Sequence, residues 1–202
     1  GTETDVVVPD TMDEGVPVKR LGTQLLAGSE TLTSVVVPDS VTILDVGALS
    51  YDNNLSEITL SSNLINIGWN AISSNDALTE LTIPASVCII DSYAVSGCYA
   101  LKKIVFEGAC PLIGPEAFGM LSDDVVIYVP DDQIEEYKKV FEENNKNLNI
   151  QPSGKPAVLY SAEDYLDTEN LKKGDTLLTL TKSSVESAKK SYQENYDAAR
   201  IA

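Results

Sequence analysis

A 23-residue repeat runs through the chain, and this period constrains the fold more than any other feature. Four rows align without a gap, starting at Leu32, Leu55, Leu78 and Leu101. Apolar residues recur at positions 1, 4, 6, 10, 13 and 18 of each row, and position 17 is always alanine. Self-similarity at a fixed period of this length is the signature of stacked repeats, so the sequence predicts a repeat solenoid.

The spacing within a row predicts the path of one coil. Positions 4 and 6 alternate as in a β-strand, and Pro38, Pro84 and Pro130 at position 7 end that strand because proline cannot donate to a ladder. The small alanine before a larger apolar residue predicts a tight 3₁₀ or short helical turn. Because one row cannot cover its own apolar side, stacked rows bury a continuous core. We expect a right-handed coil with short parallel strands.

Both ends of the repeat array depart from the regular row. Upstream, Val6 and Val8 match the strand positions, and the register resumes after a six-residue insertion within residues 10–17. Downstream, Asp132 and Glu135 have capping-box spacing, followed by one apolar helical face that contains Ile134, Tyr137, Val140 and Phe141. We therefore expect a C-terminal helical cap over the last coil, completed by residues up to 150.

The charge balance excludes some classes of partner. The chain has 31 acidic and 14 basic residues, a formal net charge of −17. Nucleic acids and anionic membranes are recognised through clustered Lys and Arg, so neither is expected as a partner. No run of 18 apolar residues occurs, so we expect no direct membrane insertion. The chain starts at Gly1 without a visible signal peptide, and we expect it to be a trimmed piece, so this start says little about location.

A composition boundary suggests two regions. Residues 1–130 contain 17 acidic and four basic residues, whereas residues 131–202 contain 14 and 10. The segment Pro152-Ser153-Gly154-Lys155-Pro156 has the composition of a linker. The sequence predicts a solenoid over 1–151, a linker over 152–156 and a small helical tail over 157–202.

Residues for chemistry are scarce. The chain has no histidine, which excludes Ser-His-Asp and Cys-His arrangements. Three cysteines form neither a disulfide framework nor a metal site; Cys98 and Cys110 are expected to be small core residues, and Cys88 an exposed thiol. The acids at Asp10, Asp13 and Glu14 do not follow a calcium-loop pattern. We expect no metal, no cofactor and no enzyme, although a carboxylate pair for glycoside hydrolysis remains an alternative.

Aromatic and strand residues give two candidate binding surfaces. Trp69 falls in an outward column just before Ala71, and Tyr93 lies one column further in the next row, which suggests a hot spot or a sugar platform. Both side chains could instead simply cover a turn. Outward strand positions form a second stripe that contains Thr59, Thr82 and Tyr128, although β-propensity alone would also place such residues there.

These residues resemble the BspA-like leucine-rich repeat family, whose repeat reads roughly LxxIxIPxxVxxIGxxAFxxCxx. The row from Leu78 carries Ile83-Pro84, Val87 and Cys98, and the next row carries Ile113-Gly114 and Ala117-Phe118. The resemblance covers residues 3 to about 151, with Ser61 and Glu107 in place of the row proline. It implies a leucine-rich repeat coil and an exported protein displayed on a bacterial surface, where some members act in adhesion.

The tail and the function leave alternatives open. The C-terminal stretch faintly resembles one helix of a FIVAR-type bundle, or it forms a simple packing helix; it reads TLTKSSVESAKKSYQENYDAARIA. The leading functional hypothesis is a non-catalytic cell-surface binding or adhesion module for a host or microbial surface protein or glycan. A structural spacer in a larger wall-associated protein is the second hypothesis, and a carbohydrate-active enzyme is the third.

Overall fold

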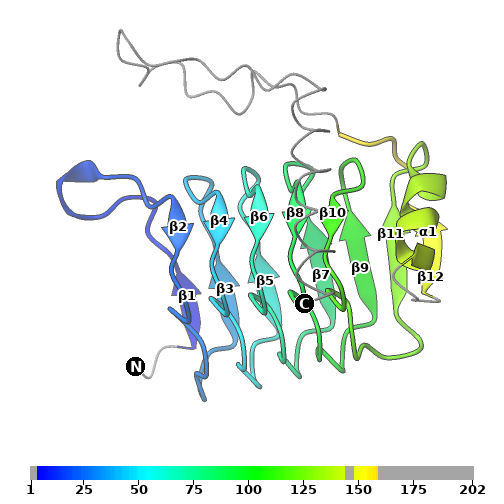
Figure 1. Cartoon of the computed structure of the whole chain (residues 1–202). Helices are drawn as coiled ribbons and strands as arrows, with labels where there is room; N and C mark the ends of the chain where they lie inside the picture. Colours follow the sequence, from blue (N-terminus) through cyan, green and yellow to red (C-terminus); the bar gives the residue numbers. More distant parts are fainter. Residues whose placement is uncertain (1–3, 144–147, 159–202) are drawn as a thin grey trace, which may run out of the picture. The chain divides into compact units, whose positions relative to one another are not determined.

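A computed structural model describes residues 4–143 and 148–158, which form a solenoid of stacked coils (Figure 1). Each of the first five coils contributes one longer and one very short strand, and all ladders between coils are parallel. The short strands form one five-stranded sheet in the order β10-β8-β6-β4-β2. The predicted leucine-rich repeat coil with short parallel strands is confirmed.

The strands have the following bounds. The longer strands are β1 (Asp5–Val7), β3 (Ser34–Val36), β5 (Glu57–Thr59), β7 (Glu80–Ile83), β9 (Lys103–Phe106), β11 (Val126–Val129) and β12 (Asn149–Pro152). The short strands are β2 (Arg20–Leu21), β4 (Ile43–Leu44), β6 (Asn66–Ile67), β8 (Ile89–Ile90) and β10 (Leu112–Ile113). The longer strands divide into the sheets β1-β3-β5 and β12-β11-β9-β7.

The strand register reproduces the sequence period. Val35 lies opposite Ile58, and Leu21 lies opposite Leu44, so the partners occupy the same position in successive rows. In the ladder of β1 with β3, Asp5 pairs with Ser34, which makes the first coil longer than the period by the predicted insertion. The inserted loop holds a 3₁₀ turn, η1 (Asp13–Gly15), and an antiparallel bridge between Thr11 and Pro17. The insertion therefore leaves the stacking intact.

The predicted apolar columns form one continuous core. Position 1 is fully or nearly fully buried in all four rows, and so are the alanines of position 17. Leu64 and Ile67, at positions 10 and 13 of the second row, have no exposed surface. Burial of one such large side chain contributes roughly 1.5–3 kcal/mol, so most of the stability comes from contacts between neighbouring coils.

A pair of left-handed residues shapes the turn of every coil. Position 16 has positive φ in Gln24, Gly47, Asn70, Tyr93 and Glu116, and position 20 has positive φ in Gly28, Tyr51, Ser74, Gly97 and Met120. The amide at position 17 donates to the carbonyl at position 14, so successive β-turns form here. The sequence prediction of a 3₁₀ or helical turn was wrong, because each left-handed residue interrupts helical backbone.

The C-terminal cap is a helix, α1 (Ile134–Glu143), packed on the last coils (Figure 1). Tyr137 and Phe141 are buried, and their rings contact Phe106 and Phe118 at centroid distances of 4.9 and 5.6 Å. The Tyr137 hydroxyl donates to the Gly108 carbonyl at 3.1 Å, and burial raises the pKa of this phenol. The predicted helical cap and its apolar face are confirmed.

The acids before the cap do not form the predicted capping box. Asp132 Oδ1 accepts a hydrogen bond from the Ala157 amide at 2.8 Å, and Asp131 Oδ1 accepts one from the Gly154 amide at 2.8 Å. The helix begins two residues after Asp132, so this carboxylate does not cap it. The capping-box prediction was wrong because amides of the later chain bind both acids.

Residues 153–158 continue along the last coils. The Ser153 amide donates to the Val129 carbonyl at 2.8 Å, and the Val158 amide donates to the Glu107 carbonyl at 2.9 Å. The segment expected to be a linker is thus hydrogen-bonded to the solenoid, and the proposed boundaries at 151 and 156 stay predictions. The chain divides into two units, Gly1–Leu159 and Tyr160–Ala202. The second unit, with the FIVAR-like stretch, lies outside the described residues.

Candidate functional site

Four large exposed side chains surround one hollow on the turn side of the coils: Tyr51, Trp69, Tyr93 and Met120. We call this the aromatic hollow. These side chains are 41–60% exposed although all four are large and apolar in part. The turns of the four regular rows each contribute one of them, so the hollow extends across coils. Its volume is about 270 Å³.

The two predicted aromatic residues meet at the centre of this hollow. The rings of Trp69 and Tyr93 lie edge to face, with centroids 6.4 Å apart and an interplanar angle of 79°. Such pairs contribute about 0.5–1.5 kcal/mol beyond the area that they bury. The crossed arrangement leaves an open apolar face on each ring. The sequence prediction that these two residues lie together on the surface is confirmed; their role in binding stays a prediction.

The backbone of the hollow is strained at three of its large side chains. Tyr51, Tyr93 and Met120 have φ values of 62, 59 and 50°. Glycine adopts this region freely, whereas other residues lose about 1 kcal/mol or more. Other coils place Gly47 or Gly97 in the same two columns. Gln24 and Glu116 have positive φ in the same column as Tyr93 without lining the hollow, so this backbone cost belongs to the turns and is not specific to the hollow.

The polar lining of the aromatic hollow is uncharged. Asn70, Ser73, Ser74 and Ser96 supply amide and hydroxyl groups, and among the described residues neither a carboxylate nor a cation belongs to the lining. In two coils the serine of position 19 donates back to the carbonyl three residues earlier, at 3.0 and 3.1 Å. The equivalent Ser96 hydroxyl does not, and it has no partner among the described residues although Ser96 is only 3% exposed.

The second predicted surface is an outward row of strand residues. Thr82, Val105 and Tyr128 lie in register on β7, β9 and β11, and Thr59 lies in register with Val36 on β5 and β3. Thr59 and Thr82 are exposed, and neither lines a described hollow. Among the described strands, no ladder joins β5 to β7, so the stripe spans two sheets. Whether it binds a partner stays a prediction.

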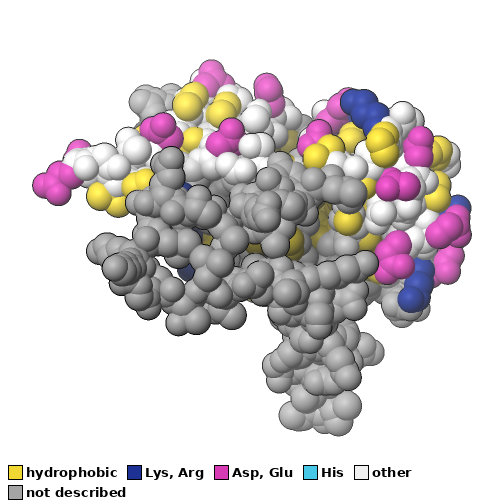
Figure 2. All heavy atoms as spheres, turned by 90° about the horizontal axis from the view of Figure 1, so that it is seen from above, with side chains coloured by type: hydrophobic (Ala, Val, Ile, Leu, Met, Phe, Trp, Pro, Cys, Tyr) yellow, Lys and Arg dark blue, Asp and Glu magenta, His cyan; other side chains and the backbone are white. Residues whose placement is uncertain are grey.

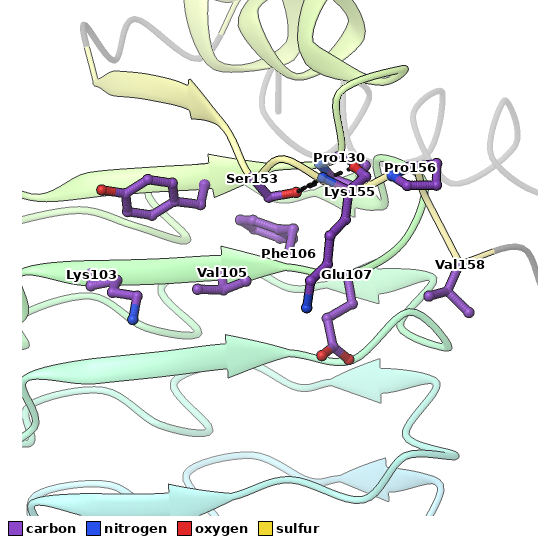
Figure 3. A pocket seen from close by; sticks show the side chains of 10 residues that line it. Lys103, Val105, Phe106, Glu107, Pro130, Ser153, Lys155, Pro156 and Val158 are labelled. Carbon is purple, nitrogen blue, oxygen red and sulfur yellow. Dashed lines mark hydrogen bonds between the residues drawn. The ribbon is translucent and has the colours of Figure 1, made fainter.

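Tyr128 does line a larger hollow next to the cap, shown in Figure 3. This cap-side hollow has a volume of about 400 Å³ and lies between β9, β11 and residues 153–158. Lys103 at its edge is paired with Glu80 at 3.0 Å. In Figure 3 the Lys155 side chain extends from the C-terminal segment toward Glu107. The hollow's wall ends at Val158, where the described chain ends.

A polar ladder runs through the coils below the aromatic hollow. Asp52 Oδ1 accepts a hydrogen bond from the Ser29 amide at 2.5 Å, and Asn75 Oδ1 accepts one from the Asp52 amide at 3.0 Å. The Cys98 thiol donates to the Ile72 carbonyl at 3.3 Å. Burial raises the pKa of Asp52 to about 6 and that of Cys98 to about 11. Neither the aromatic hollow nor the cap-side hollow includes Asp52, Asn75 or Cys98 in its described lining.

The cysteines agree only in part with the sequence predictions. Cys98 is fully buried, and Cys110 is partly buried against the core, both as expected. Cys88, expected as an exposed thiol, is half-buried, and its Sγ donates to the Ser86 carbonyl at 3.4 Å. Cys88 is therefore only partly exposed, in the same burial class as Cys110, and the expectation that it alone would be an exposed thiol was wrong.

The surface around these sites is acidic. Figure 2 shows Asp and Glu side chains spread over the visible described surface, with Lys and Arg at few points. Three of the four bases in residues 1–130 form ion pairs with acids: Arg20 with Asp45, Lys102 with Asp124 and Lys103 with Glu80. Within residues 4–143 and 148–158, no three Cys, Asp or Glu side chains gather as metal ligands, and no helix could cross a membrane.

The repeat geometry agrees with a known family. The family model described as the BspA type leucine rich repeat region matches six copies over residues 19–149. The chain belongs to this BspA-type leucine-rich repeat family. The matched description is that of a repeat region and names no catalytic activity. A search of the curated proteins finds no match.

Solved structures of bacterial repeat proteins are similar to the chain. A leucine-rich repeat protein from Bacteroides capillosus ATCC 29799 is 38% identical, over 54% of this chain and 80% of its own, with a TM-score of 0.48. The pneumococcal vaccine antigen PcpA has a TM-score of 0.55 at 17% identity, over 75% of this chain and 42% of its own. A leucine-rich repeat protein from Bacteroides ovatus ATCC 8483 has a TM-score of 0.50 at 19% identity, over 73% and 42%. The chain spans less than half of the last two proteins.

Sequence reasoning missed several members of both hollows. Tyr51 and Met120 belong to the aromatic hollow and were not predicted, because position 20 was not recognised as left-handed backbone. The signal was present: Gly28 and Gly97 share their column, and a glycine column marks left-handed backbone. The cap-side hollow had no comparable signal, since its wall is the segment expected to be a linker.

Proposed function

We propose that this chain is a non-catalytic binding module of a bacterial surface protein and that it recognises its partner through the aromatic hollow. The observation that carries the proposal is the crossed Trp69–Tyr93 pair, held open to solvent by turns of neighbouring coils. Trp and Tyr are the residues most enriched at binding hot spots, because they bury a large area and lose few rotatable bonds. Adhesion to a host or microbial surface is the biological role that we propose for this recognition.

The position of these side chains supports binding over simple coverage of a turn. A side chain that covered a turn would bury its apolar surface, whereas Tyr51 and Met120 remain 55 and 60% exposed. All four large residues gather on one side of the solenoid, as in an interaction patch. Family membership supports the bacterial surface as the location.

The chemistry of the hollows supports a non-catalytic role. Glycoside hydrolysis needs two carboxyl groups on opposite sides of the scissile bond. Within the part of the chain that the structure describes, the lining of the aromatic hollow contains no carboxylate, and Glu107 is the one carboxylate in the lining of the cap-side hollow. Asp52, with its raised pKa, is enclosed between coils and lines neither hollow. The carbohydrate-active enzyme is therefore the weakest of the three hypotheses.

A structural spacer remains the second candidate function. Stacked coils with a capped end form a stiff module, and the chain covers less than half of PcpA, so similar coils occur within longer proteins. A spacer would present no specific surface and would tolerate changes at the aromatic hollow. The two functions therefore differ in one measurable property, which is saturable binding.

The test is a binding array of the full chain against polysaccharides and host matrix proteins, at low and at about 150 mM salt. We expect at least one saturable interaction that persists at the higher salt. Trp69→Ala and Tyr93→Ala should each weaken it by about tenfold or more, the effect of a hot-spot residue. Tyr99→Ala is the matched control, because Tyr99 is 59% exposed and lines neither hollow.

The alternative outcomes are distinct. A blank array, or binding that disappears at about 150 mM salt, would favour the spacer. Equal losses in the Tyr99 and Trp69 variants would show that any exposed aromatic residue suffices, and would remove the aromatic hollow from the proposal. Product release from any polysaccharide would restore the enzyme hypothesis.

A further inference from the structure

We propose that the aromatic hollow binds one sugar ring of a neutral glycan. This inference rests on the proposed function and narrows its partner to one chemical class. A sugar ring combines apolar C–H faces with a rim of hydroxyl groups, and it therefore needs aromatic surface and uncharged hydrogen-bonding groups in one small site. The aromatic hollow offers both.

The size of the hollow fits a single ring. Its volume of about 270 Å³ lies just below the range of roughly 300–1,000 Å³ that is typical of pockets for drug-sized ligands. A folded protein partner would need a broad interface of about 800 Å² on this side. A hollow between the turns of adjacent coils instead accepts one projecting unit of a longer molecule.

The two central rings provide the apolar walls. Trp69 and Tyr93 cross at 79°, so each ring exposes a face that the other does not cover. Aromatic faces carry partial negative charge, and the C–H groups of a sugar carry partial positive charge. Tyr51 and Met120 extend the apolar surface at both ends of the hollow. An extended glycan could therefore contact more than one coil.

The polar groups beside these rings suit sugar hydroxyls. The Asn70 side-chain amide offers two donors and an acceptor, and the Ser74 hydroxyl offers one donor and two lone pairs. The Ser73 hydroxyl already donates to the Asn70 carbonyl at 3.1 Å, so it offers a sugar only an acceptor. Ser96 adds the unpartnered hydroxyl in the lining. A buried polar group without a partner lowers stability, so rotation of the Ser96 side chain toward a bound hydroxyl would recover a hydrogen bond that the free protein lacks.

The charge distribution selects a neutral glycan over an acidic one. No described residue places a cation in the lining, and the chain carries a net charge of −17. The carboxylate of a uronic or sialic acid is bound most strongly by a positively charged group, for which Arg is the usual choice. Most bases before the cap, namely Arg20, Lys102 and Lys103, are already paired with acids. A carboxylated sugar would thus meet net repulsion.

The test is a fluorescence titration of the full chain, because Trp69 is its only tryptophan and lies in the site. The probes are neutral oligomers of glucose, mannose, galactose and N-acetylglucosamine, with galacturonate and hyaluronan oligomers as acidic comparisons. We expect a saturable change in emission with at least one neutral oligomer, at a Kd of roughly 10 µM–1 mM. We expect no saturation with the acidic oligomers below about 10 mM.

Three variants define the site. Tyr93→Ala removes a wall, and Asn70→Asp keeps the shape and the left-handed preference while replacing the amide donor with a negative charge. Both should weaken the binding of the neutral oligomer by about tenfold or more. Ser96→Ala should weaken it by about three- to tenfold, the effect of one neutral hydrogen bond. Tyr99→Ala should leave the Kd unchanged within about twofold. Circular dichroism checks that each variant is folded.

The outcomes separate this inference from the proposed function. Flat titrations with every neutral oligomer would overturn it, and so would tighter binding of an acidic oligomer. If the array then yields a protein partner whose binding depends on Trp69, the proposed function stands and the glycan inference fails. If the array is also blank, both fail. Neutral-glycan binding that ignores Tyr93→Ala and Asn70→Asp would place the sugar elsewhere and would also overturn the inference.

Discussion

Replacement of Asp52 by asparagine is expected to stabilise the solenoid in a pH-dependent way. Asp52 is completely buried in the polar ladder, its Oδ1 accepts from the Ser29 amide, and its Oδ2 has no partner among the described residues. Burial therefore raises its pKa from the ordinary 3.8 to about 6. A charged carboxylate at this place costs stability at neutral pH.

The size and sign of the effect follow from proton linkage. Between pH 3.8 and 6 the folded state keeps a proton that the unfolded state has already released, so stability falls as the pH rises. Each pKa unit corresponds to about 1.4 kcal/mol, which gives a penalty of about 3 kcal/mol. The penalty is complete above pH 6, and below pH 3.8 both states hold the proton and the penalty disappears.

Asparagine removes this charge and keeps the Oδ1 acceptor. Its Nδ2 can donate to carbonyls as Asn75 does in the next coil, where Nδ2 donates to Leu49 and Ile72 at 2.8 Å. We expect Asp52→Asn to raise the free energy of unfolding by about 2–3 kcal/mol at pH 7, and the melting temperature by roughly 5–10 °C. The gain should shrink to nearly zero at pH 3.

The assay is urea unfolding of both proteins at pH 3, 4, 5, 6 and 7, followed by circular dichroism. The difference between the two proteins isolates Asp52 from the other acids. Asp76→Asn is the control, because Asp76 is exposed. A surface substitution of this kind should change stability by at most roughly 0.5 kcal/mol. A difference that is constant from pH 3 to pH 7, or a variant that is less stable at pH 7, would refute the reasoning.

Three further variants test the backbone and the cap. Tyr51→Gly should raise the free energy of unfolding by about 0.5–1 kcal/mol in thermal or urea unfolding, because glycine adopts the left-handed backbone of this position without strain. Tyr99→Gly is the control: Tyr99 has no positive φ, so this change should lower the free energy of unfolding by a similar amount. If both variants changed stability in the same direction, the strain account would be contradicted. Tyr137→Phe should lower the free energy of unfolding by about 1 kcal/mol, because the Gly108 carbonyl loses its hydrogen-bond donor. An unchanged urea midpoint would show that this hydrogen bond does not stabilise the protein. Gly68→Ala should lower the free energy of unfolding by about 1–3 kcal/mol in thermal unfolding, because a Cβ there would lie 2.6 Å from a carbonyl oxygen of the preceding coil. If the variant were as stable as the wild-type chain, the coils would have to move apart at little cost.

The coil and its register could be predicted from the sequence because burial repeats with the period. Val35, Ile58 and Leu81 occupy the same buried environment in three successive rows, so the sequence alone identifies this column as inward-facing. The longer first coil, in which Asp5 pairs with Ser34, follows equally from the inserted residues. Such local and repeated constraints leave few alternative registers, since a slip of one residue would turn a whole strand inside out.

The shape of the turns could not be predicted in the same way. Trp69 and Tyr93 were identified from their columns, but Tyr51 and Met120 join them only because position 20 is left-handed. Tyrosine and methionine give no hint of positive φ, and the glycines that do so lie in other rows. The capping-box prediction for Asp132 failed for a related reason. The hydrogen-bond partner of Asp132, the Ala157 amide, lies 25 residues later in the chain and outside any local motif.

The measurement that tests the central claim most directly is a comparison of two variants against a partner identified in the array. The dissociation constant would be measured for the wild-type chain, Trp69→Ala and Tyr128→Ala, which alter the aromatic hollow and the strand stripe respectively. Recognition through the aromatic hollow predicts that Trp69→Ala raises the Kd about tenfold or more while Tyr128→Ala leaves it unchanged within about twofold. The reverse pattern would contradict the account and would move the binding surface to the strands.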